Sequence, residues 1–445
     1  MDRAHEQIGE PMTEADLERP PQEDCPCKEG MFPKASRRQF LRGGSLLTAA
    51  AASVLLPKRT LAADDDMGSW TVPGQIAKSD YGTRSQFEKV VREATPAGTD
   101  ALTPLQSLWG IITPSSLHFE RHHNGVPTID PAQHRLIIHG MVDQPMKYSV
   151  ADLKRFPSVS RTIFIECSGN SGGTSRSATP KTAQAAHGLT STSEWTGVRV
   201  STLMSEVGVK DGAAWVLAEG ADGAMLSRSV PIDKIMDDAF VAFAQNGEAI
   251  RPENGYPMRL ILPGWEGNIN VKWLRRLKIG DKPFMTREET GKYTDLITLT
   301  GKARQFTWVM EAKSLITFPS GDMHLPGKGF YEISGIAYSG TGRISKVMVS
   351  ADGGKSWAQA ALQEPVHSKA FTRFRVPWRW DGGPAVLQSQ AWDEAGNVQP
   401  TRAQLVAGRG ETTKVPPVTA FVSQHYNAIV SWSIERGGEV KHVYA

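Results

Sequence analysis

The sequence has few cysteines, no long hydrophobic run and no excess of charge of one sign. No apolar stretch reaches the ~18 residues that a membrane-spanning helix requires, so we expect no such span. With 50 Lys and Arg against 47 Asp and Glu, the chain lacks the basic excess of a nucleic-acid-binding protein and the charge imbalance of a disordered chain. The 42 glycines, 28 prolines and 12 tryptophans favour a fold rich in strands and loops over a helical bundle.

The N-terminal region has the order of an export signal. Residues 36–42 contain the arginine pair Arg37-Arg38, a modestly apolar run follows over residues 45–56, and Ala62-Ala63 offers a cleavage site. This order is typical of the twin-arginine route, which carries folded proteins and suggests a cofactor inserted before export. We therefore interpret residues 1–63 as a leader with a signal peptide and predict a periplasmic protein.

The three cysteines are Cys25, Cys27 and Cys167. Removal of the leader would leave Cys167 alone, so the processed chain can form no internal disulfide. The sequence also lacks the C-x-x-C-H motif of covalent haem and the cysteine cluster of an iron–sulfur centre. A single thiol in an oxidising compartment is a liability unless it is buried or used.

The residues around Cys167 favour a functional role of the thiol over a role in core packing. Residues 162–166 read as a buried strand, and residues 167–173 form a polar, glycine-rich loop, so the strand delivers the thiol to a site. Three chemistries suit this arrangement, namely a nucleophilic cysteine, a phosphate-binding loop and a thiolate ligand of a soft metal. Spacing alone leaves all three chemistries open, because the sequence does not show which histidine lies close enough to Cys167 to act as the base of a nucleophile.

The length of 445 residues and a change of pattern predict two domains after a polar N-terminal arm. Residues 64–115 form the arm, and residues 116–300 mix strands with short helices in an irregular α+β pattern. Residues 301–420 carry short strands and turns typical of an all-β sandwich, followed by a C-terminal segment over 421–445. Expected helices cover Val150–Phe156, capped by Ser149, and Val200–Val207; expected strands include Arg135–His139, Trp215–Glu219, Val241–Ala244, Met258–Leu262, Gly327–Ile336, Lys346–Ser350, Ser356–Ala361, Thr372–Val376 and Leu387–Trp392.

Six segments between residues 115 and 402 form a recognisable set. They are Phe119–His123, the Cys167 loop, Arg251–Arg259, Asn270–Trp273, Val349–Trp357 and Ala391–Pro400. Together they resemble the sulfite oxidase family of molybdenum enzymes, in the family's order and near its spacing. Within the family, the likeness is greatest to the molybdenum subunits of periplasmic sulfane dehydrogenases. The resemblance implies a molybdopterin-binding domain followed by an immunoglobulin-like dimerisation domain.

The resemblance also implies a set of site residues. Cys167 would bind molybdenum, Arg121 would bind an anion, and Tyr293 would lie over the open face of the metal. The residues implied to hold the molybdenum–molybdopterin cofactor are Phe119, Glu120, Arg121, His122 and His123 at the pterin, Asp222 as a hydrogen-bond partner of the pterin, Arg259 and Lys272 on the phosphate side, and Asn270 and Val271 through backbone or amide bonds. Asn254 is a further implied cofactor-binding residue.

Plainer explanations stand beside these roles. His118, His122 and His123 could instead bind zinc, although no acidic or cysteine fourth ligand is evident. Asp222 could be an ordinary turn residue. Arg259 and Lys272 could be solvated charges at strand ends, and Tyr293 an aromatic residue of a linker.

Departures from the family pattern bear on the substrate. Animal sulfite oxidases carry a histidine where this chain has Asn254, and arginines where it has Ser171 and Gly172, and residues 425–428 offer no arginine near the C-terminus. Less positive charge and smaller side chains favour a bulkier, less charged sulfur substrate over a small dianion. His187 is a candidate to replace part of the lost charge, with a surface histidine as the alternative.

The implied function is oxidation of reduced sulfur, held as sulfane sulfur on a carrier protein during thiosulfate oxidation. Oxygen would pass from the metal to sulfur, electrons would leave to a separate c-type cytochrome, and the protein would be a dimer. The alternatives are a free-sulfite:cytochrome c dehydrogenase, a reductase of oxidised methionine, a cysteine hydrolase and, from a different class, a non-catalytic exported binding protein.

Overall fold

The computed structural model describes residues 83–95, 97–172, 174, 181–297, 300–409 and 425–444. Almost all of them belong to one compact unit, Arg84–Ala445. The twin-arginine signal, Cys25, Cys27 and the first part of the predicted arm lie outside the described residues. Within the described ranges, no helix is both long and apolar enough to cross a membrane.

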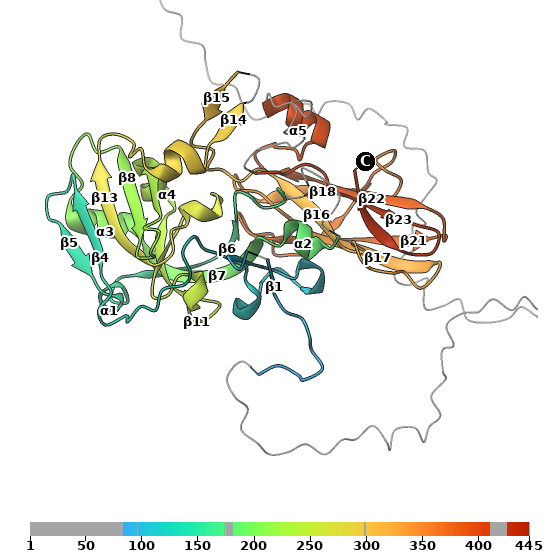
Figure 1. Cartoon of the computed structure of the whole chain (residues 1–445), viewed down its shortest axis with the longest axis horizontal. Coiled ribbons are helices and arrows are strands. Elements are labelled where there is room, and N and C mark those ends of the chain that lie inside the picture. Colours follow the sequence, from blue (N-terminus) through green and yellow to red (C-terminus); the bar gives the residue numbers. More distant parts are fainter. Residues whose placement is uncertain are drawn as a thin grey trace, which may run out of the picture. The chain divides into compact units, whose positions relative to one another are not determined.

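The first domain is built on two sheets (Figure 1). One has the order β5-β4-β13-β8-β9, with β13 parallel to β4 and the other pairs antiparallel. The second has the order β11-β10-β7-β6, with β12 also paired to β10. The strands are β4 (Leu136–Gly140), β5 (Met146–Tyr148), β6 (Ser158–Glu166), β7 (Thr190–Arg199), β8 (Trp215–Gly220), β9 (Ser227–Pro231), β10 (Phe240–Gln245), β11 (Glu248–Ala249), β12 (Arg259–Ile261) and β13 (Leu274–Gly280).

Short helices connect these strands, and local sequence explains both predicted ones. Ser149 and Asp152 form a reciprocal capping box, so α1 begins as predicted, but it ends at Leu153. Helix α3 has the predicted bounds and buries Val200, Leu203, Met204 and Val207 on one face, as helical periodicity requires. The helices of this domain are α1 (Val150–Leu153), α2 (Ala183–His187), α3 (Val200–Val207) and α4 (Ile232–Asp237), with 3-10 turns η4 (Pro252–Asn254) and η5 (Gly267–Ile269) and a π-helix η6 (Glu288–Lys292).

The described part of the arm is more ordered than an extended segment. Strands β1 (Glu93–Ala94) and β2 (Asp100–Leu102) form a small sheet with β3 (Glu120–Arg121), and 3-10 turns η2 (Leu105–Ser107) and η3 (Ser115–Leu117) follow β2. The pairing places Asp100 opposite Arg121. Strands of two or three residues leave no periodic pattern, which is why the sequence did not reveal them.

The C-terminal domain is a β-sandwich. Its sheets have the orders β16-β17-β21-β20 and β19-β18-β22-β23-β24, and side chains from both, such as Phe374 and Leu387, share one hydrophobic core. The predicted α+β domain followed by an immunoglobulin-like sandwich is confirmed. The strands are β16 (Lys313–Phe318), β17 (Gly329–Tyr338), β18 (Ile344–Ser350), β19 (Ala358–Gln359), β20 (Ala361–Leu362), β21 (Thr372–Trp380), β22 (Ala385–Asp393), β23 (Ser431–Ile434) and β24 (Val440–Val443), after a hairpin of β14 (Asp295–Ile297) and β15 (Lys302–Arg304), with helix α5 (Arg402–Arg409).

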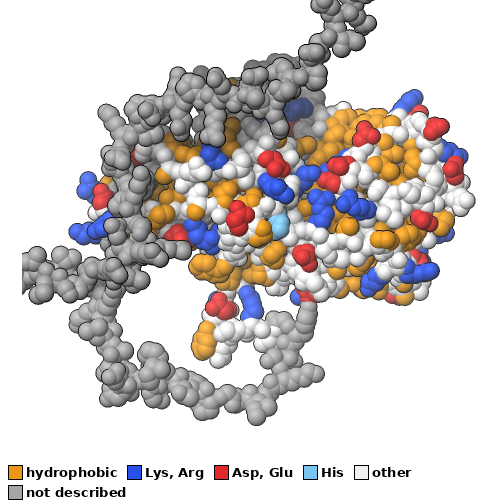
Figure 2. All heavy atoms as spheres, turned by 180° about the vertical axis from the view of Figure 1, so that it is seen from behind, with side chains coloured by type: hydrophobic (Ala, Val, Ile, Leu, Met, Phe, Trp, Pro, Cys, Tyr) orange, Lys and Arg blue, Asp and Glu red, His pale blue; other side chains and the backbone are white. Residues whose placement is uncertain are grey.

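The two domains make direct contacts. The Phe164 N–H donates to the Lys369 carbonyl at 2.9 Å, and the Met310 N–H donates to the Gly264 carbonyl at 3.0 Å. Strands β23 and β24 extend the sheet begun by β18 and β22, so the C-terminal segment completes the sandwich. Figure 2 shows basic and acidic side chains interspersed over one face, in keeping with the balanced charge of the sequence.

Candidate active site

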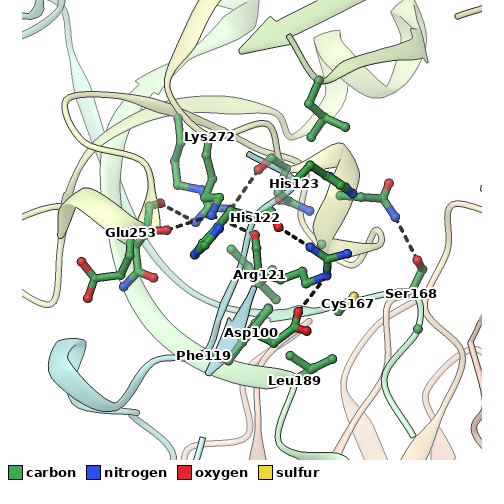
Figure 3. Close-up of a pocket in the computed structure, with 18 of the residues that line it drawn as sticks. Asp100, Phe119, Arg121, His122, His123, Cys167, Ser168, Leu189, Glu253 and Lys272 are labelled. Atoms are coloured by element: carbon green, nitrogen blue, oxygen red, sulfur yellow. Dashed lines mark hydrogen bonds and ion pairs between the residues drawn. The ribbon is translucent and has the colours of Figure 1, made fainter. Parts of the chain in front are cut away.

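A cavity of about 300 Å³ opens beside the end of strand β6 (Figure 3). Residues from the arm, from the loops after β6 and β8, and from η4, η5 and the end of η6 all reach it. It collects most of the residues that the sequence predicted. Those that line it are Phe119, Arg121, His122, His123, Cys167, Asp222, Asn254, Arg259, Asn270, Lys272 and Tyr293.

Cys167 is the first residue after β6, so the strand aims it at the cavity. Its N–H donates to the Leu189 carbonyl at 2.9 Å, and its own carbonyl accepts the Asn170 N–H at 2.9 Å. A β-carbon at Gly267 would come within 2.9 Å of the Glu166 carbonyl oxygen, so this glycine lets η5 pack against the strand end. Burial raises the pKa of the thiol to about 11. A thiol of that pKa is a poor nucleophile, whereas a bound metal would favour the thiolate.

Arg121 and the arm lie next to the thiol. The Arg121 Nε is 2.7 Å from Asp100 Oδ1, and Figure 3 shows the two side chains meeting at the Cys167 end of the cavity. Beyond burial and a backbone hydrogen bond, the strongest influences on the Cys167 pKa come from Arg121, Asp100 and Glu266. The thiol therefore lies near a guanidinium that is already paired with a carboxylate.

Tyr293 closes another wall of the cavity. It follows π-helix η6, an irregularity frequent at functional sites, and its hydroxyl lies 3.0 Å from His123 Nε2. The Arg228 guanidinium packs 4.8 Å from the centre of its ring, and Glu289 holds that guanidinium at 2.7 Å. Burial raises the pKa of Tyr293, so its phenol stays protonated and can donate a hydrogen bond.

Arg259 and Lys272 bring two cations to the same cavity without an ion-pair partner in the described part of the chain. Arg259 donates to the carbonyls of Asn254 and Asn270 at 2.7 and 2.8 Å, and its Nε has no partner. Lys272 donates to the carbonyls of Arg121 and Glu253 at 3.0 and 2.8 Å. Burial lowers the pKa of Arg259 to about 9, and burial with repulsion by Arg259 lowers that of Lys272 to about 7. A bound anion would reverse both shifts.

Other predicted residues have structural partners as well as a place in the wall. Asp222 Oδ1 accepts the Leu226 N–H at 3.2 Å, so this residue also serves as a turn aspartate. The Asn270 amide is used within the protein, since its Oδ1 accepts the Leu262 N–H at 2.7 Å. Glu120 and Val271 do not line the cavity: Glu120 lies 3.6 Å from Arg92, and Val271 is buried in the domain core.

The structure corrects the interpretation of His187 and Ser171. His187 is fully buried and its Nδ1 lies 2.6 Å from Ser171 Oγ. Burial, with a contribution from Lys313, holds its pKa well below the usual value, so His187 is neutral and replaces no lost charge. It is not a surface histidine either. Ser171 is a buried residue of the Cys167 loop and does not line the cavity, so its small side chain does not widen the approach.

Sequence reasoning did not identify several lining residues. Asp100, Glu253 and Asn268 reach the cavity, as does exposed Lys292 next to Tyr293. Asn268 and Lys292 lie within two residues of predicted positions, so proximity was a usable signal for them. Asp100 comes from the arm and gave none.

The zinc alternative finds no support in the geometry. His118 Nδ1 is engaged with the Phe119 carbonyl at 2.9 Å, and its ring stacks on Phe119. Among the residues that the structure describes, no group of three or more His, Cys, Asp or Glu side chains could hold a metal ion. A metal in this cavity would therefore depend on ligands that a cofactor brings, with Cys167 as the protein's contribution.

The residues present fit such a cofactor. Arg259 Nε, His118 Nε2 and His122 Nδ1 are buried at the cavity without a hydrogen-bond partner. Buried polar atoms are nearly always paired, so these atoms point to a polar ligand. A thiol near one end and two mutually repelling cations elsewhere in the wall suit a metal joined to an anionic group.

Comparisons with known proteins agree with this geometry. Residues 123–288 match the family model described as "Oxidoreductase molybdopterin binding domain", and residues 304–413 match "Mo-co oxidoreductase dimerisation domain". The solved sulfane dehydrogenase SoxCD from Paracoccus pantotrophus is 43% identical with a TM-score of 0.80, over 85% of this chain and 97% of that chain.

More distant similarity extends to nitrate reductases. The NADH enzyme of Ulva prolifera is 30% identical over 65% of this chain and 38% of its own length. The NAD(P)H enzyme of Hordeum vulgare is 29% identical over 69% of this chain and 39% of its own length. The chain thus spans about two fifths of the length of these relatives. By the two matched domains and the likeness to a solved relative over nearly its whole length, the chain belongs to the sulfite oxidase family of molybdopterin oxidoreductases, whose cofactor is molybdenum–molybdopterin.

Proposed function

We propose that this oxidoreductase oxidises reduced sulfur, presented as sulfane sulfur on a carrier protein, and passes the electrons to a c-type cytochrome. The observation that carries the choice of substrate is that the Arg121 guanidinium next to Cys167 is already paired with Asp100, at 2.7 Å. A paired guanidinium attracts a small dianion such as sulfite less strongly than a free one does, and it tolerates a neutral or singly charged sulfur group. The likeness to a sulfane dehydrogenase supports the same choice.

The cofactor, when bound, supplies two-electron redox chemistry and oxygen-atom transfer. Cys167 would hold the metal, and Arg259 and Lys272 would hold the anionic part of the cofactor. Arg121 and the protonated phenol of Tyr293 would hydrogen-bond oxygen atoms as negative charge develops on the substrate. His123, 3.0 Å from the Tyr293 hydroxyl, would orient that phenol.

The partners and the compartment are part of the proposal. The cytochrome would be a separate chain, because the sequence has no C-x-x-C-H motif. The match of residues 304–413 to a dimerisation domain supports a dimer. The arginine pair Arg37-Arg38 and the apolar run after it support export to the periplasm by the twin-arginine route.

The test is a substrate comparison on purified, metal-loaded protein. Turnover with cytochrome c as acceptor is measured with a carrier-bound persulfide and with free sulfite. Nitrate reduction is measured with a reduced dye. We expect the persulfide to be the best substrate. Good turnover of sulfite or nitrate with none of the persulfide would contradict the proposal.

A sulfite dehydrogenase is the second candidate, favoured by one observation. Lys292 is exposed at the cavity wall next to Tyr293 and could attract an anion. If free sulfite is the substrate, Lys292→Gln should raise the KM for sulfite, and the effect should shrink at high salt. Under our proposal, the same substitution leaves persulfide turnover nearly unchanged.

A further inference from the structure

One buried lysine of the C-terminal domain bonds to the residues on both sides of Cys167. Lys313 is the first residue of β16 and is 1% exposed. Its Nζ donates to Glu166 Oε1 at 2.7 Å and to Ser171 Oγ at 2.8 Å. Glu166 directly precedes Cys167, and Ser171 follows it by four positions. The ammonium therefore closes the loop that carries the thiol.

Neighbouring bonds complete the arrangement. Asn170 Nδ2 donates to the same Glu166 oxygen at 2.8 Å, and Asn170 Oδ1 accepts the Leu189 N–H at 3.1 Å. Ser171 has a positive φ of 64°, a conformation that disfavours a residue with a β-carbon. Such a conformation persists when its surroundings over-determine it, and here Lys313 and His187 both hold the Ser171 hydroxyl.

The chemistry of the pair argues for a role beyond stability. A buried ion pair recovers little more than the cost of removing both charges from water, and apolar residues of similar volume often stabilise a fold as well. What the Lys313 ammonium provides, and an apolar side chain would not, is two directed bonds to fixed points on either side of Cys167. The loop's position is then set by the C-terminal domain.

We propose that Lys313 is a positioning residue that fixes the Cys167 loop and so presents the sulfur to the metal. The inference rests on the proposed role of Cys167 as the metal ligand. It gives the C-terminal sandwich a part in the metal centre in addition to any part in dimerisation.

The variants must separate positioning from folding. Lys313→Met alone would leave Glu166 as an uncompensated buried carboxylate and could prevent folding. The double variant Glu166→Gln/Lys313→Met removes both charges and leaves an amide at position 166 to meet Asn170. Ser171→Ala removes only one of the two acceptors of the lysine. The matched control is Lys369→Met, because Lys369 also makes an ion pair between the domains, 2.7 Å from Asp238, without touching the loop.

Two readouts do not depend on turnover. In full-length protein from cells that cannot make the cofactor, the alkylation rate of Cys167 by iodoacetamide is followed by peptide mass spectrometry. In loaded protein, molybdenum per chain and the absorption spectrum of the metal centre are measured. We expect the folded double variant to be alkylated several-fold faster, to carry several-fold less molybdenum and to have an altered spectrum. Ser171→Ala should show the same changes to a smaller degree, and Lys369→Met should match the wild type.

A folded double variant with the wild-type alkylation rate, metal content and spectrum would overturn the inference. Equal changes in Lys369→Met would also overturn it, because they would show a general loosening between the domains. If the double variant does not fold, Ser171→Ala decides by the same readouts. Failure of the proposed function looks different: substrate assays or metal binding by Cys167→Ser would contradict that function, while alkylation of the metal-free protein would still report on the loop.

Discussion

Two sets of buried polar groups, one around Gln399 in the sandwich and one at the cavity of the first domain, differ in how fully they are hydrogen-bonded. In the sandwich, Gln399 Oε1 accepts from the backbone and side chain of Ser314, and Gln399 Nε2 donates to the Ser314 carbonyl. In the first domain, Arg259 Nε and His118 Nε2 are buried at the cavity with no partner. A fully hydrogen-bonded network favours one packing arrangement, whereas buried polar atoms without a hydrogen-bond partner indicate where a polar ligand binds.

The buried charges of Asp393 in the sandwich and Lys272 at the cavity differ in the same way. Burial opposes ionisation of Asp393 in the sandwich, but hydrogen bonds from Thr341, Asn397 and Ser339 outweigh it and lower the pKa of that carboxyl. Lys272 at the cavity donates only to backbone carbonyls and has no ion-pair partner among the described residues, and burial lowers its pKa to about 7. Hydrogen bonds thus stabilise the charge of Asp393, while the cavity holds cations at a cost that a bound anion would remove.

The largest effect should come from removing the thiol. Cys167→Ser should abolish turnover, by more than ~100-fold, the upper range for residues that only support a metal ligand. The fold should persist, because Cys167 is only partly buried and its backbone bonds remain. Activity, molybdenum content and circular dichroism check this. Wild-type activity in the variant would contradict the proposed role of Cys167.

A cavity in the sandwich core should affect stability without affecting the metal site. Phe374 is fully buried in the core shared by the two sheets, so Phe374→Ala should cost ~3–5 kcal/mol in the free energy of unfolding. Denaturant unfolding measures the loss. Molybdenum per folded chain should equal that of the wild type. A fall in molybdenum per folded chain would contradict the claim that the sandwich core affects stability without affecting the metal site.

The buried Lys272 should make the stability of the metal-free protein depend on pH. Between about pH 7 and pH 10.5, Lys272 binds a proton in the unfolded chain more readily than in the fold, so stability rises with pH across this window. Lys272→Met should reduce that rise by ~1–3 kcal/mol. Burial also lowers the pKa of Lys234 to about 8, so the difference between the two proteins is the readout. An identical rise in the wild type and in Lys272→Met would show that the fold does not lower the pKa of Lys272.

The smallest effect should come from Asp352, a hydrogen-bonded carboxylate of the sandwich. Burial opposes ionisation of Asp352, yet bonds from Ser356, Ser350 and Lys355 outweigh it and lower its pKa to about 2. The stabilisation is complete above the usual value near 4 and is lost as pH falls through about 2. Asp352→Asn should cost ~1 kcal/mol at neutral pH and nothing below pH 2, measured by thermal unfolding. An equal cost at every pH would assign the effect to packing.

Local patterns in the sequence were enough to predict much of the fold. The capping pair Ser149 and Asp152 and the apolar spacing in Val200–Val207 located two helices, and runs of short strands located the sandwich. Strands β23 and β24 escaped prediction because four-residue strands after a long gap carry little periodicity. The pairing of β23 with β22 is a long-range contact that no local pattern encodes.

For the site, local patterns combined with the family resemblance were sufficient where a segment carries several side chains together. The Cys167 loop and the Asn270–Trp273 segment both reach the cavity. What could not be predicted were partners from distant parts of the chain, such as Asp100 opposite Arg121 and Lys313 beneath Cys167. His187 was misjudged for the same reason, since its ring meets Ser171 and its pKa is affected by Lys313, and neither residue is its neighbour in sequence.

The most direct test of the whole account is elemental analysis of purified protein, paired with pterin fluorescence after oxidation, for the wild type and Cys167→Ser. We predict about one molybdenum and one pterin per wild-type chain, with the metal lost or altered in the variant. Active wild-type protein without molybdenum, prepared from a molybdenum-replete host, would contradict the account.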